Sequence, residues 1–270
     1  HSGRYSRILF VNSKFEQRLG DLVVKPRVYY NQWTHLHPVT GFINDTRSWT
    51  RTAGTDLEAQ REHVVAGIRG TLVAGVTGRV QWNDDVRRFE YRDVVHAGGA
   101  PTGRITATLS DAEGDLMETQ SQRSWLVGVF AQESLRPHDR VIVDLGLRLD
   151  RSAFRVRQDE LTRYDFAAGT YVEGGGASVT NRTFDLPAPK AGLSVRVTRA
   201  VSVYGSAARA SQVPSESEIV SNHTLRAQYP AVPELSASAS TAFEAGVKVR
   251  APAVTMDLAA YHMTVGDEIV

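Results

Sequence analysis

The sequence of 270 residues contains no cysteine and no long apolar run. Without cysteine there is no disulfide framework, no thiolate nucleophile and no thiolate metal ligand. A helix that crosses a bilayer needs about 18 or more successive apolar residues. The longest candidate, between Val64 and Val76, is interrupted by Arg69. These absences exclude a disulfide-linked scaffold, cysteine chemistry and a helical membrane protein.

The chain also lacks an excess of charge of either sign. It has 31 lysine and arginine residues against 30 aspartate and glutamate residues, so its formal net charge is +1. A nucleic-acid-binding protein carries a clustered basic excess, and we therefore expect no nucleic-acid partner. Most of the basic residues are arginine. Arginine keeps its charge and binds carboxylates in a fork geometry, which suits ion pairs that line a polar cavity.

The most regular feature that is present is a two-residue alternation of apolar and polar side chains. In the segment 140–150, RVIVDLGLRLD, the odd positions are apolar, and apart from Ile142 the even positions are polar or glycine. Successive side chains of a β-strand point to opposite faces, so this strand meets an apolar medium on one side and a polar medium on the other. The same alternation recurs in the segments 22–37, 71–83, 123–134, 190–198 and 237–250.

Other segments alternate less regularly, and helical periodicity is nowhere better supported. The less regular strands are predicted at 5–18, 54–66, 200–211 and 253–268. The last of them changes phase near Ala259 and Ala260, which predicts a β-bulge at that point.

Connections between these strands alternate in length. Short turns are predicted near residues 20–21, 67–70, 137–139, 198–200 and 251–253, and long polar loops at 37–54, 84–121, 151–186 and 212–235. Sorting of connections by length, with strands long enough to cross a bilayer at a tilt, is typical of membrane barrels. We predict an all-β fold: a partial transmembrane antiparallel up-and-down β-barrel of about ten meander strands, with short periplasmic turns and long extracellular loops. A soluble β-sandwich or β-repeat protein also alternates and is the alternative.

No enzyme motif is present. The sequence has no Gly-x-Ser-x-Gly elbow, no phosphate-binding loop and no dinucleotide fingerprint. Charged residues such as Glu133, Asp144 and Lys248 lie at regular strand spacing, which is typical of ion pairs on the wet interior of a barrel. We therefore predict no catalytic residue, no enzymatic activity and no cofactor.

Aromatic and imidazole side chains are concentrated just before the first long loop. Trp33, His35 and His37 alternate along one predicted strand, so they share its polar face. No third metal ligand is placed beside the two histidines, and no metal site is predicted. We expect that a substrate entering from outside contacts these residues. Weaker candidates in the loops are Trp49, Arg51, Tyr91 and Arg92.

Four stretches resemble the barrel of TonB-dependent outer-membrane receptors. The stretch 129–150 is similar to a family hairpin with aromatic-x-Gln-Asp/Glu before a short turn and Gly-Leu-Arg-Tyr-Asp after it. The stretch 203–219 resembles a strand that enters a loop at Phe-x-x-Pro-x-x-x-Glu. The stretch 235–248 resembles Leu-x-Pro-Glu-x-Ser-x-x-Tyr-Glu-x-Gly-x-Lys, and 259–270 resembles the following strand. The residues that fill family positions include Gln132, Gly146, Arg148, Asp150, Pro214, Glu244 and Gly246. The departures from the family pattern include Leu149, Ser211, Ala237 and Ser238.

This resemblance implies a receptor in the outer membrane of a Gram-negative bacterium that takes up a scarce nutrient. In such receptors the outer loops bind the ligand, the barrel encloses a plug domain, and the TonB–ExbB–ExbD system moves the plug. The implied partners are that system, a ferric siderophore or similar small ligand, and the lipid bilayer with its lipopolysaccharide. A passive porin, an autotransporter-type barrel and a soluble β-rich surface binding module are the alternatives.

The resemblance also implies that the barrel is incomplete. Receptors of this type have roughly 22 strands and an N-terminal plug domain. We therefore expect residues 1–270 to be a partial barrel from which the plug and the C-terminal strands are absent. A sheet with an apolar face and two open edges is not expected to fold alone in water.

Overall fold

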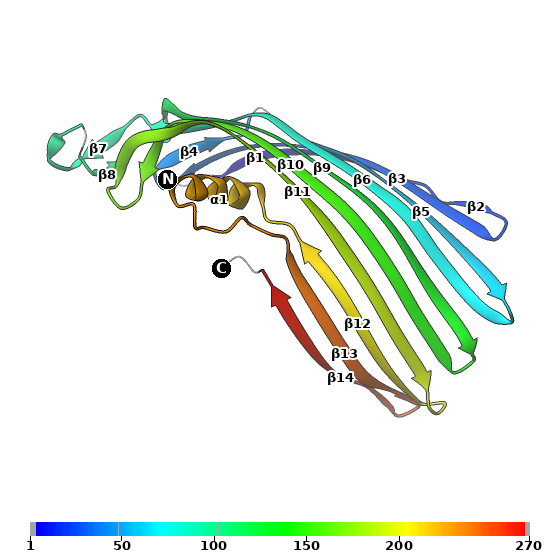
Figure 1. The fold of residues 1–270 in the computed structure, drawn as a ribbon. Coiled ribbons are helices and arrows are strands. Elements are labelled where there is room, and N and C mark those ends of the chain that lie inside the picture. Colours follow the sequence, from blue (N-terminus) through cyan, green and yellow to red (C-terminus); the bar gives the residue numbers. More distant parts are fainter. Residues whose placement is uncertain (1–3, 48, 102, 268–270) are drawn as a thin grey trace.

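The computed structural model describes residues 4–47, 49–101 and 103–267, and its main body is one curved antiparallel β-sheet (Figure 1). In chain order the elements are β1 (Tyr5–Lys14), β2 (Gln17–Leu19), β3 (Leu22–Val39), β4 (Phe42–Asp45), β5 (Thr50–Val65), β6 (Ile68–Tyr91), β7 (Val94–His96), a 3₁₀ turn (Ala97–Gly99), β8 (Ile105–Thr108), β9 (Glu113–His138), β10 (Val141–Asp165), β11 (Thr170–Arg196), β12 (Val201–Gln212), α1 (Glu216–Gln228), β13 (Ser238–Ala251) and β14 (Val254–Gly266). None of the described residues form a helix that is long and apolar enough to cross a membrane.

Chain order is preserved across the main sheet, which has twelve strands. β1 and β2 both pair with the same edge of β3, so they count as one interrupted strand. β4 and β5 both lie between β3 and β6 and likewise count as one interrupted strand. Twelve strands with these two pairs counted once leave ten, each antiparallel to its neighbour. The predicted all-β meander is confirmed. We call the end with the short connections the turn end, and the opposite end the loop end.

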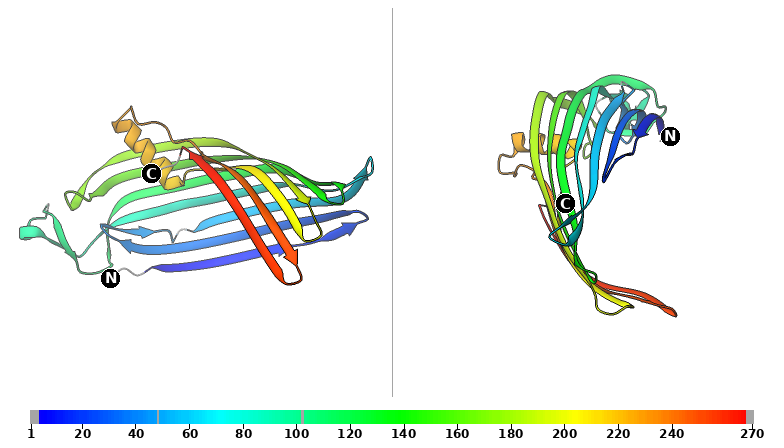
Figure 2. Two further views of the ribbon diagram at one scale, coloured as in Figure 1. Left: turned by 90° about the horizontal axis from the view of Figure 1, so that it is seen from below. Right: turned by 90° about the vertical axis from the view of Figure 1, so that its right-hand side faces the viewer.

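The two faces of the sheet differ in chemistry. Leu57, Val76, Val129 and Leu149 are direct partners across four neighbouring strands, and their side chains are 44–49% exposed on a face that no second layer of described residues covers. We call this convex surface the outer face. The opposite, concave surface is the inner face, which carries ion pairs such as Lys25 with Glu58 (3.0 Å). Figure 2 shows the curvature.

Aromatic residues mark the upper limit of the apolar rows on the outer face. Tyr30 and Trp125 lie in one cross-strand row, and Trp82 lies one row nearer the loop end. Such girdles stand at the membrane–water boundary of barrel proteins. In the row of Trp82 the outer face also carries arginine, at Arg51 and Arg123. The membrane-spanning part of the sheet is therefore the part between this aromatic row and the turn end.

Three of the long loops predicted from the sequence, 37–54, 84–121 and 151–186, are largely strand. β10 and β11 pair without interruption by a loop as far as Tyr164 and Tyr171, apart from a bulge near Glu160. The prediction was wrong because it relied on alternation of apolar and polar residues. Beyond the aromatic row the outer face meets water and carries Arg155 and Arg157, while Phe154, next to Arg155 in β10, is buried on the inner face, so the apolar phase reverses although the backbone pairing continues.

The β-bulge predicted near Ala259 and Ala260 was also wrong. The register between β13 and β14 is continuous through both residues. The phase of the apolar pattern changes because Met263 and Val265 face inward near the loop end, where they line a cavity together with Val213. The phase of the apolar pattern therefore changes because the apolar side chains near the loop end face the interior, and not because the strand contains an extra residue.

An arginine introduced on the outer face tests this assignment of the two faces. Ala207 shares its row with Leu145 on the outer face, whereas the adjacent Ser206 shares its row with Asp144 and Glu244 on the inner face. We expect Ala207→Arg to reduce the unfolding free energy in lipid by about 2–4 kcal/mol, and Ser206→Arg to have little effect. Denaturant unfolding of the full-length receptor in lipid vesicles measures both. Equal losses in the two variants would contradict the assignment.

Candidate functional site

The long connection after β12 folds back against the inner face. Ile219 of α1 packs against Phe154, Phe184 and Leu186, and these four side chains form a buried apolar cluster. Figure 1 shows α1 lying beneath the arch of the sheet. The segment after the helix is tied down as well, since Arg182 pairs with a carboxylate oxygen of Glu234 at 2.7 Å. The connection between β12 and β13 therefore occupies part of the space enclosed by the curved sheet near its loop end.

The helix itself was not predicted, although the sequence contains its start signal. Ser215 is the N-cap: its Oγ accepts a hydrogen bond from the Glu218 amide, and the Glu218 carboxylate accepts one from the Ser215 amide at 2.7 Å. This reciprocal pair is a capping box, readable as Ser-x-x-Glu after Pro214. The helix has little amphipathic periodicity, and only one of its apolar side chains, Ile219, is fully buried. Periodicity alone therefore missed it.

Trp33, His35 and His37 follow one another along the inner face of β3, where Trp33 stacks on His35 and the His37 ring is tilted against His35; we call these three residues the imidazole stack. The ring centroids are 4.8 Å apart between Trp33 and His35, and 5.3 Å apart between His35 and His37. His35 is only 4% exposed, and its Nδ1 lies 3.0 Å from Oγ of Ser6 on β1. Among the described residues, no group of three His, Asp or Glu side chains is arranged to hold a metal ion. The shared face follows the sequence prediction, and a role in ligand binding stays a prediction.

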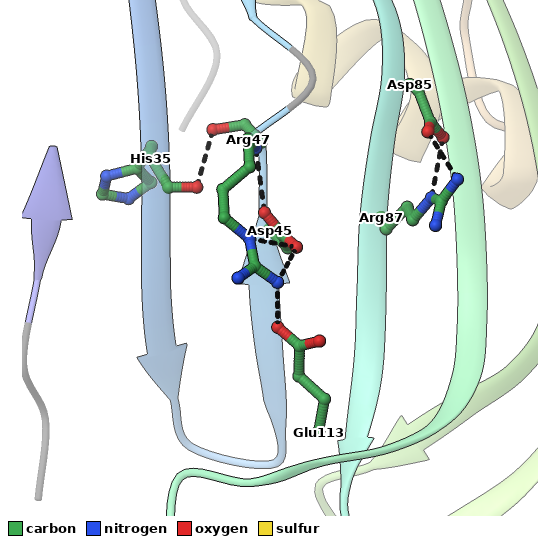
Figure 3. Close-up of polar contacts among 7 residues, drawn as sticks. His35, Asp45, Arg47, Asp85, Arg87 and Glu113 are labelled. Carbon is green, nitrogen blue, oxygen red and sulfur yellow. Dashed lines mark hydrogen bonds and ion pairs between the residues drawn. The ribbon is translucent and has the colours of Figure 1, made fainter. Parts of the chain in front are cut away.

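A network of ion pairs fixes the turn beside this stack (Figure 3). Arg47 donates to Asp45 and also pairs with Glu113 at 2.6 Å, so it joins the segment after β4 to the start of β9. The backbone amide and hydroxyl of Thr46 both donate to the carbonyl oxygen of His35. The backbone of His35 is thereby held by two hydrogen bonds from the turn after β4.

The weaker sequence candidates are scattered. Arg51 does not face the interior or a loop: it lies on the outer face of β5, where its guanidinium pairs with Asp84 at 2.6 Å. Trp49 is in the turn before β5 with a positive φ of 76° and is exposed. Arg92 is exposed and pairs with its neighbour Asp93. The placement of Arg51 in a loop was wrong, because it lies in β5, and its role in ligand binding stays a prediction.

Tyr91, in contrast, belongs to a cavity at the loop end. A hollow of about 380 Å³ is lined by three tyrosines from distant segments, Tyr91, Tyr164 and Tyr171, and by Asp111. The Tyr91 hydroxyl donates to the carbonyl oxygen of Val39 at 2.9 Å, and its amide donates to the Tyr171 hydroxyl oxygen at 3.0 Å. We call this the tyrosine cavity. Sequence reasoning named Tyr91 but missed Tyr164 and Tyr171, which meet through the pairing of β10 with β11 and contact Tyr91 of β6 through the hydrogen bond from its amide.

A glycine makes room for one wall of the tyrosine cavity. Gly41 has a φ of 91°, and a Cβ atom there would lie 2.5 Å from the Tyr164 ring. Tyr164 and Tyr171 meet edge to face at 5.5 Å between ring centroids. Phenol hydroxyls and aromatic faces bind polar oxygens and rings of a small ligand, and no group here is arranged for a covalent reaction.

The residues at family-like positions form contacts across the inner face. Lys190 donates to the side-chain oxygen of Gln132 at 2.6 Å, and Arg148 donates to Asp150 at 2.6 Å. A Cβ atom at Gly146 would lie 2.6 Å from the Lys190 side chain. The small residue and the charged residues of this hairpin therefore act as one packing unit.

The second group of family-like positions behaves in the same way. The Tyr204 hydroxyl donates to Glu244 at 2.6 Å, and the Tyr204 ring covers Gly246, where a Cβ atom would lie 2.6 Å from it. Pro214 is buried where the chain leaves β12 for α1. These residues shape the barrel wall rather than a ligand site.

Truncation of Ile219 tests how firmly α1 is held in the interior. We expect Ile219→Ala to cost about 2–5 kcal/mol of local stability, because it removes the only helix side chain in the buried cluster of described residues. Amide hydrogen exchange of residues 216–228 should then accelerate, while exchange in β10 stays slow. Leu225→Ala, at an exposed position of the same helix, is the matched control. Unchanged exchange in the first variant would show that other contacts hold the helix.

The pH dependence of the tyrosine cavity follows from one phenol in the extracellular extension of β11. Burial raises the pKa of Tyr171 to about 12. Because the fold favours the neutral phenol, its contribution to stability is complete below about pH 10 and is lost as the pH rises through about 12. Burial also raises the pKa of Tyr91, so absorbance at 295 nm should show more than one late-titrating tyrosine, and Tyr171→Phe should remove the last ionisation step. A titration in which every phenol ionises near pH 10 would refute this.

Comparisons with known proteins identify the family to which this fold belongs. A family model described as TonB dependent receptor-like, beta-barrel matches residues 3–270. No curated protein sequence gives a significant match. The chain is similar to the ferric citrate transporter FecA in its unliganded form, with a TM-score of 0.69 and 10% identity over 98% of this chain and 35% of that chain. It is similar to the siderophore receptor PiuA from Acinetobacter baumannii, with a TM-score of 0.65 and 15% identity over 97% of this chain and 40% of that chain.

A third similar structure is that of a transporter for a different cargo. The copper transporter OprC has a TM-score of 0.63 and 17% identity over 98% of this chain and 40% of that chain. The chain therefore spans well under half the length of these solved structures, and at such identities the likeness concerns the fold. Since the family model matches nearly the whole chain, the chain belongs to the TonB-dependent receptor β-barrel family, whose members are transporters of the Gram-negative outer membrane and not enzymes.

Proposed function

We propose that the receptor containing this chain imports a scarce nutrient by TonB-dependent transport, and that its cargo is a ferric siderophore or a similar small chelate. The observation that carries this proposal is the tyrosine cavity at the extracellular end of a barrel wall whose interior is charged. The hydroxyls and rings of Tyr164 and Tyr171 suit the oxygens and rings of a chelate. The arginines of the inner face suit a ligand with negative charge.

The imidazole stack lies further along the same entry path. Trp33 and His37 are half-buried on the inner face and flank the buried His35. In this proposal they form a second contact for the cargo after it leaves the tyrosine cavity. α1 lies against the same face, so the cargo would have to move past this helix. Such an obstruction fits a gated receptor better than an open pore.

Energy coupling requires parts of the receptor beyond these strands. β1 and β14 are the two edges of the described sheet, and an unpaired edge in a membrane leaves backbone groups without hydrogen-bond partners. We propose that residues 1–270 form part of a larger barrel that pairs with both edges and encloses a plug. The TonB–ExbB–ExbD system would act on that plug.

Ligand binding by the full-length receptor tests the site. We expect the double variant Tyr164→Ala with Tyr171→Ala to weaken binding of a ferric siderophore by about tenfold or more, because stacking and hydrogen bonds are both lost. Tyr229→Ala, at an exposed tyrosine outside the cavity, is the matched control. Fluorescence quenching with a panel of ferric siderophores, haem and copper chelates gives the affinities. If no member of the panel loses affinity in the double variant, the cavity is not the binding site.

Uptake tests the mechanism separately from the site. Radiolabelled cargo should enter cells that express the receptor, and uptake should cease in a strain that lacks TonB. Uptake that continues without TonB would identify a passive pore instead. Growth on limiting iron, with and without the receptor, shows whether iron is the transported element.

A further inference from the structure

The tyrosine cavity has no basic side chain among the described residues that line it. Asp111 is the one charged residue of that lining. Arg92, Arg104 and Arg163 adjoin lining residues in the sequence, but each is exposed and none of the three lines the cavity. The charge of the described lining is therefore that of a single carboxylate.

The phenols of the cavity are subject to the same negative charge. Burial raises the pKa of Tyr91, and the Asp111 carboxylate raises it further. Burial likewise raises the pKa of Tyr171 to about 12, and the Glu90 carboxylate adds to that shift. Surroundings that oppose the loss of a proton from a phenol also favour a cation over an anion beside it.

The three cavity tyrosines differ from other tyrosines of the inner face, whose rings are covered by cations of the chain itself. The guanidinium of Arg27 lies 5.3 Å from the ring centroid of Tyr29, and the ammonium of Lys248 lies 5.1 Å from that of Tyr204. Within the described part of the chain, no lysine or arginine is placed in this way over a cavity tyrosine. These rings are therefore open to a cation that is not part of the chain.

The shape and size of the cavity suit a small cationic group. The ring planes of Tyr164 and Tyr171 meet at 70°, so the two rings form two walls of a corner, and Asp111 lines the same hollow. Tyrosine ring faces attract ammonium groups that lie within about 6 Å of the ring centroid. Sites that enclose a whole ligand of drug size occupy roughly 300–1,000 Å³. A hollow of about 380 Å³ therefore fits one part of a chelate better than the whole of it.

We propose that the tyrosine cavity binds a positively charged amine or ammonium group of the cargo, and that it thereby selects a chelate with such a group over an anionic one. This inference rests on the proposed function, in which the cavity is a site of cargo binding. Arginines of the inner face are less accessible to an anion, because Arg88, Arg148 and Arg182 each pair with a carboxylate at 2.6–2.7 Å. An anionic cargo would have to compete with those carboxylates, whereas a cation meets no competing cation in the described lining of the cavity.

Two ferric trihydroxamates that differ by one charge test this selectivity in the full-length receptor. Ferrioxamine B has a pendant primary amine that is protonated at neutral pH, and N-acetylferrioxamine B lacks this charge. We expect the unchanged receptor to bind ferrioxamine B about fivefold more tightly than the acetylated chelate, as measured by isothermal titration calorimetry. Asp111→Asn should reduce this preference. Asp159→Asn, which removes the same charge from an exposed position of β10, should leave it unchanged. Equal affinities for the two chelates would overturn the inference.

Tetramethylammonium tests the cavity without any chelate. Saturation-transfer NMR should show that its methyl protons contact the unchanged receptor. The signal should fall in Asp111→Asn and in the double variant Tyr164→Ala with Tyr171→Ala, but not in Asp159→Asn, because only the first two change the lining of the cavity. An absent signal, or a signal of equal strength in all of these proteins, would overturn the inference.

The same measurements separate this inference from the proposed function. If the double tyrosine variant weakens binding of ferric citrate, an anionic chelate, and tetramethylammonium does not bind, the cargo site stands and the cation site is rejected. If tetramethylammonium binds in the cavity but no chelate depends on Tyr164 and Tyr171, the cation site stands and the proposed cargo site is rejected.

Discussion

The whole structure depends on backbone hydrogen bonding between long antiparallel strands. In hydrocarbon every peptide group needs a partner, and between the two edge strands β1 and β14 the neighbouring strands supply it. This pairing fixes which side chains share a face, so an apolar row such as Leu57, Val76, Val129 and Leu149 is matched by a charged row on the other side. The apolar rows are stabilised by contact with the membrane. The inner face therefore does not need an apolar core, and it is free to contain ion pairs and a folded loop.

The inner face is a packed surface at its extracellular end and a charged one toward the turn end. α1 covers part of it through Ile219, and ion pairs such as Arg148 with Asp150 fill much of the rest. The candidate ligand contacts, the tyrosine cavity and the imidazole stack, lie where the wall rises above the membrane. Chemistry on the outer face follows the same vertical order, from apolar rows through aromatic residues to arginines.

Much of the membrane-spanning fold could be predicted from the sequence, because the bilayer imposes a strict alternation. The strand around 140–150 and the short turns show this. The extracellular half could not be predicted in the same way, since the outer face of β10 and β11 meets water there and the apolar side chains, such as Phe154 and Phe184, face inward against α1. The stack of Trp33, His35 and His37 follows from strand parity alone. The tyrosine cavity does not, because Tyr91, Tyr164 and Tyr171 meet only through register. The capping box at Ser215 was readable but went unused.

The length of β9, β10 and β11 has a consequence for how the mouth of the receptor behaves. Each has 25–27 residues, which is about 80–90 Å along the strand, far more than a tilted crossing requires. The part of these strands that extends beyond the lipid is therefore a rigid hydrogen-bonded sheet and not a set of flexible loops. A ligand that reaches Tyr164 or Tyr171 meets side chains whose spacing is already set, so capture costs little ordering entropy.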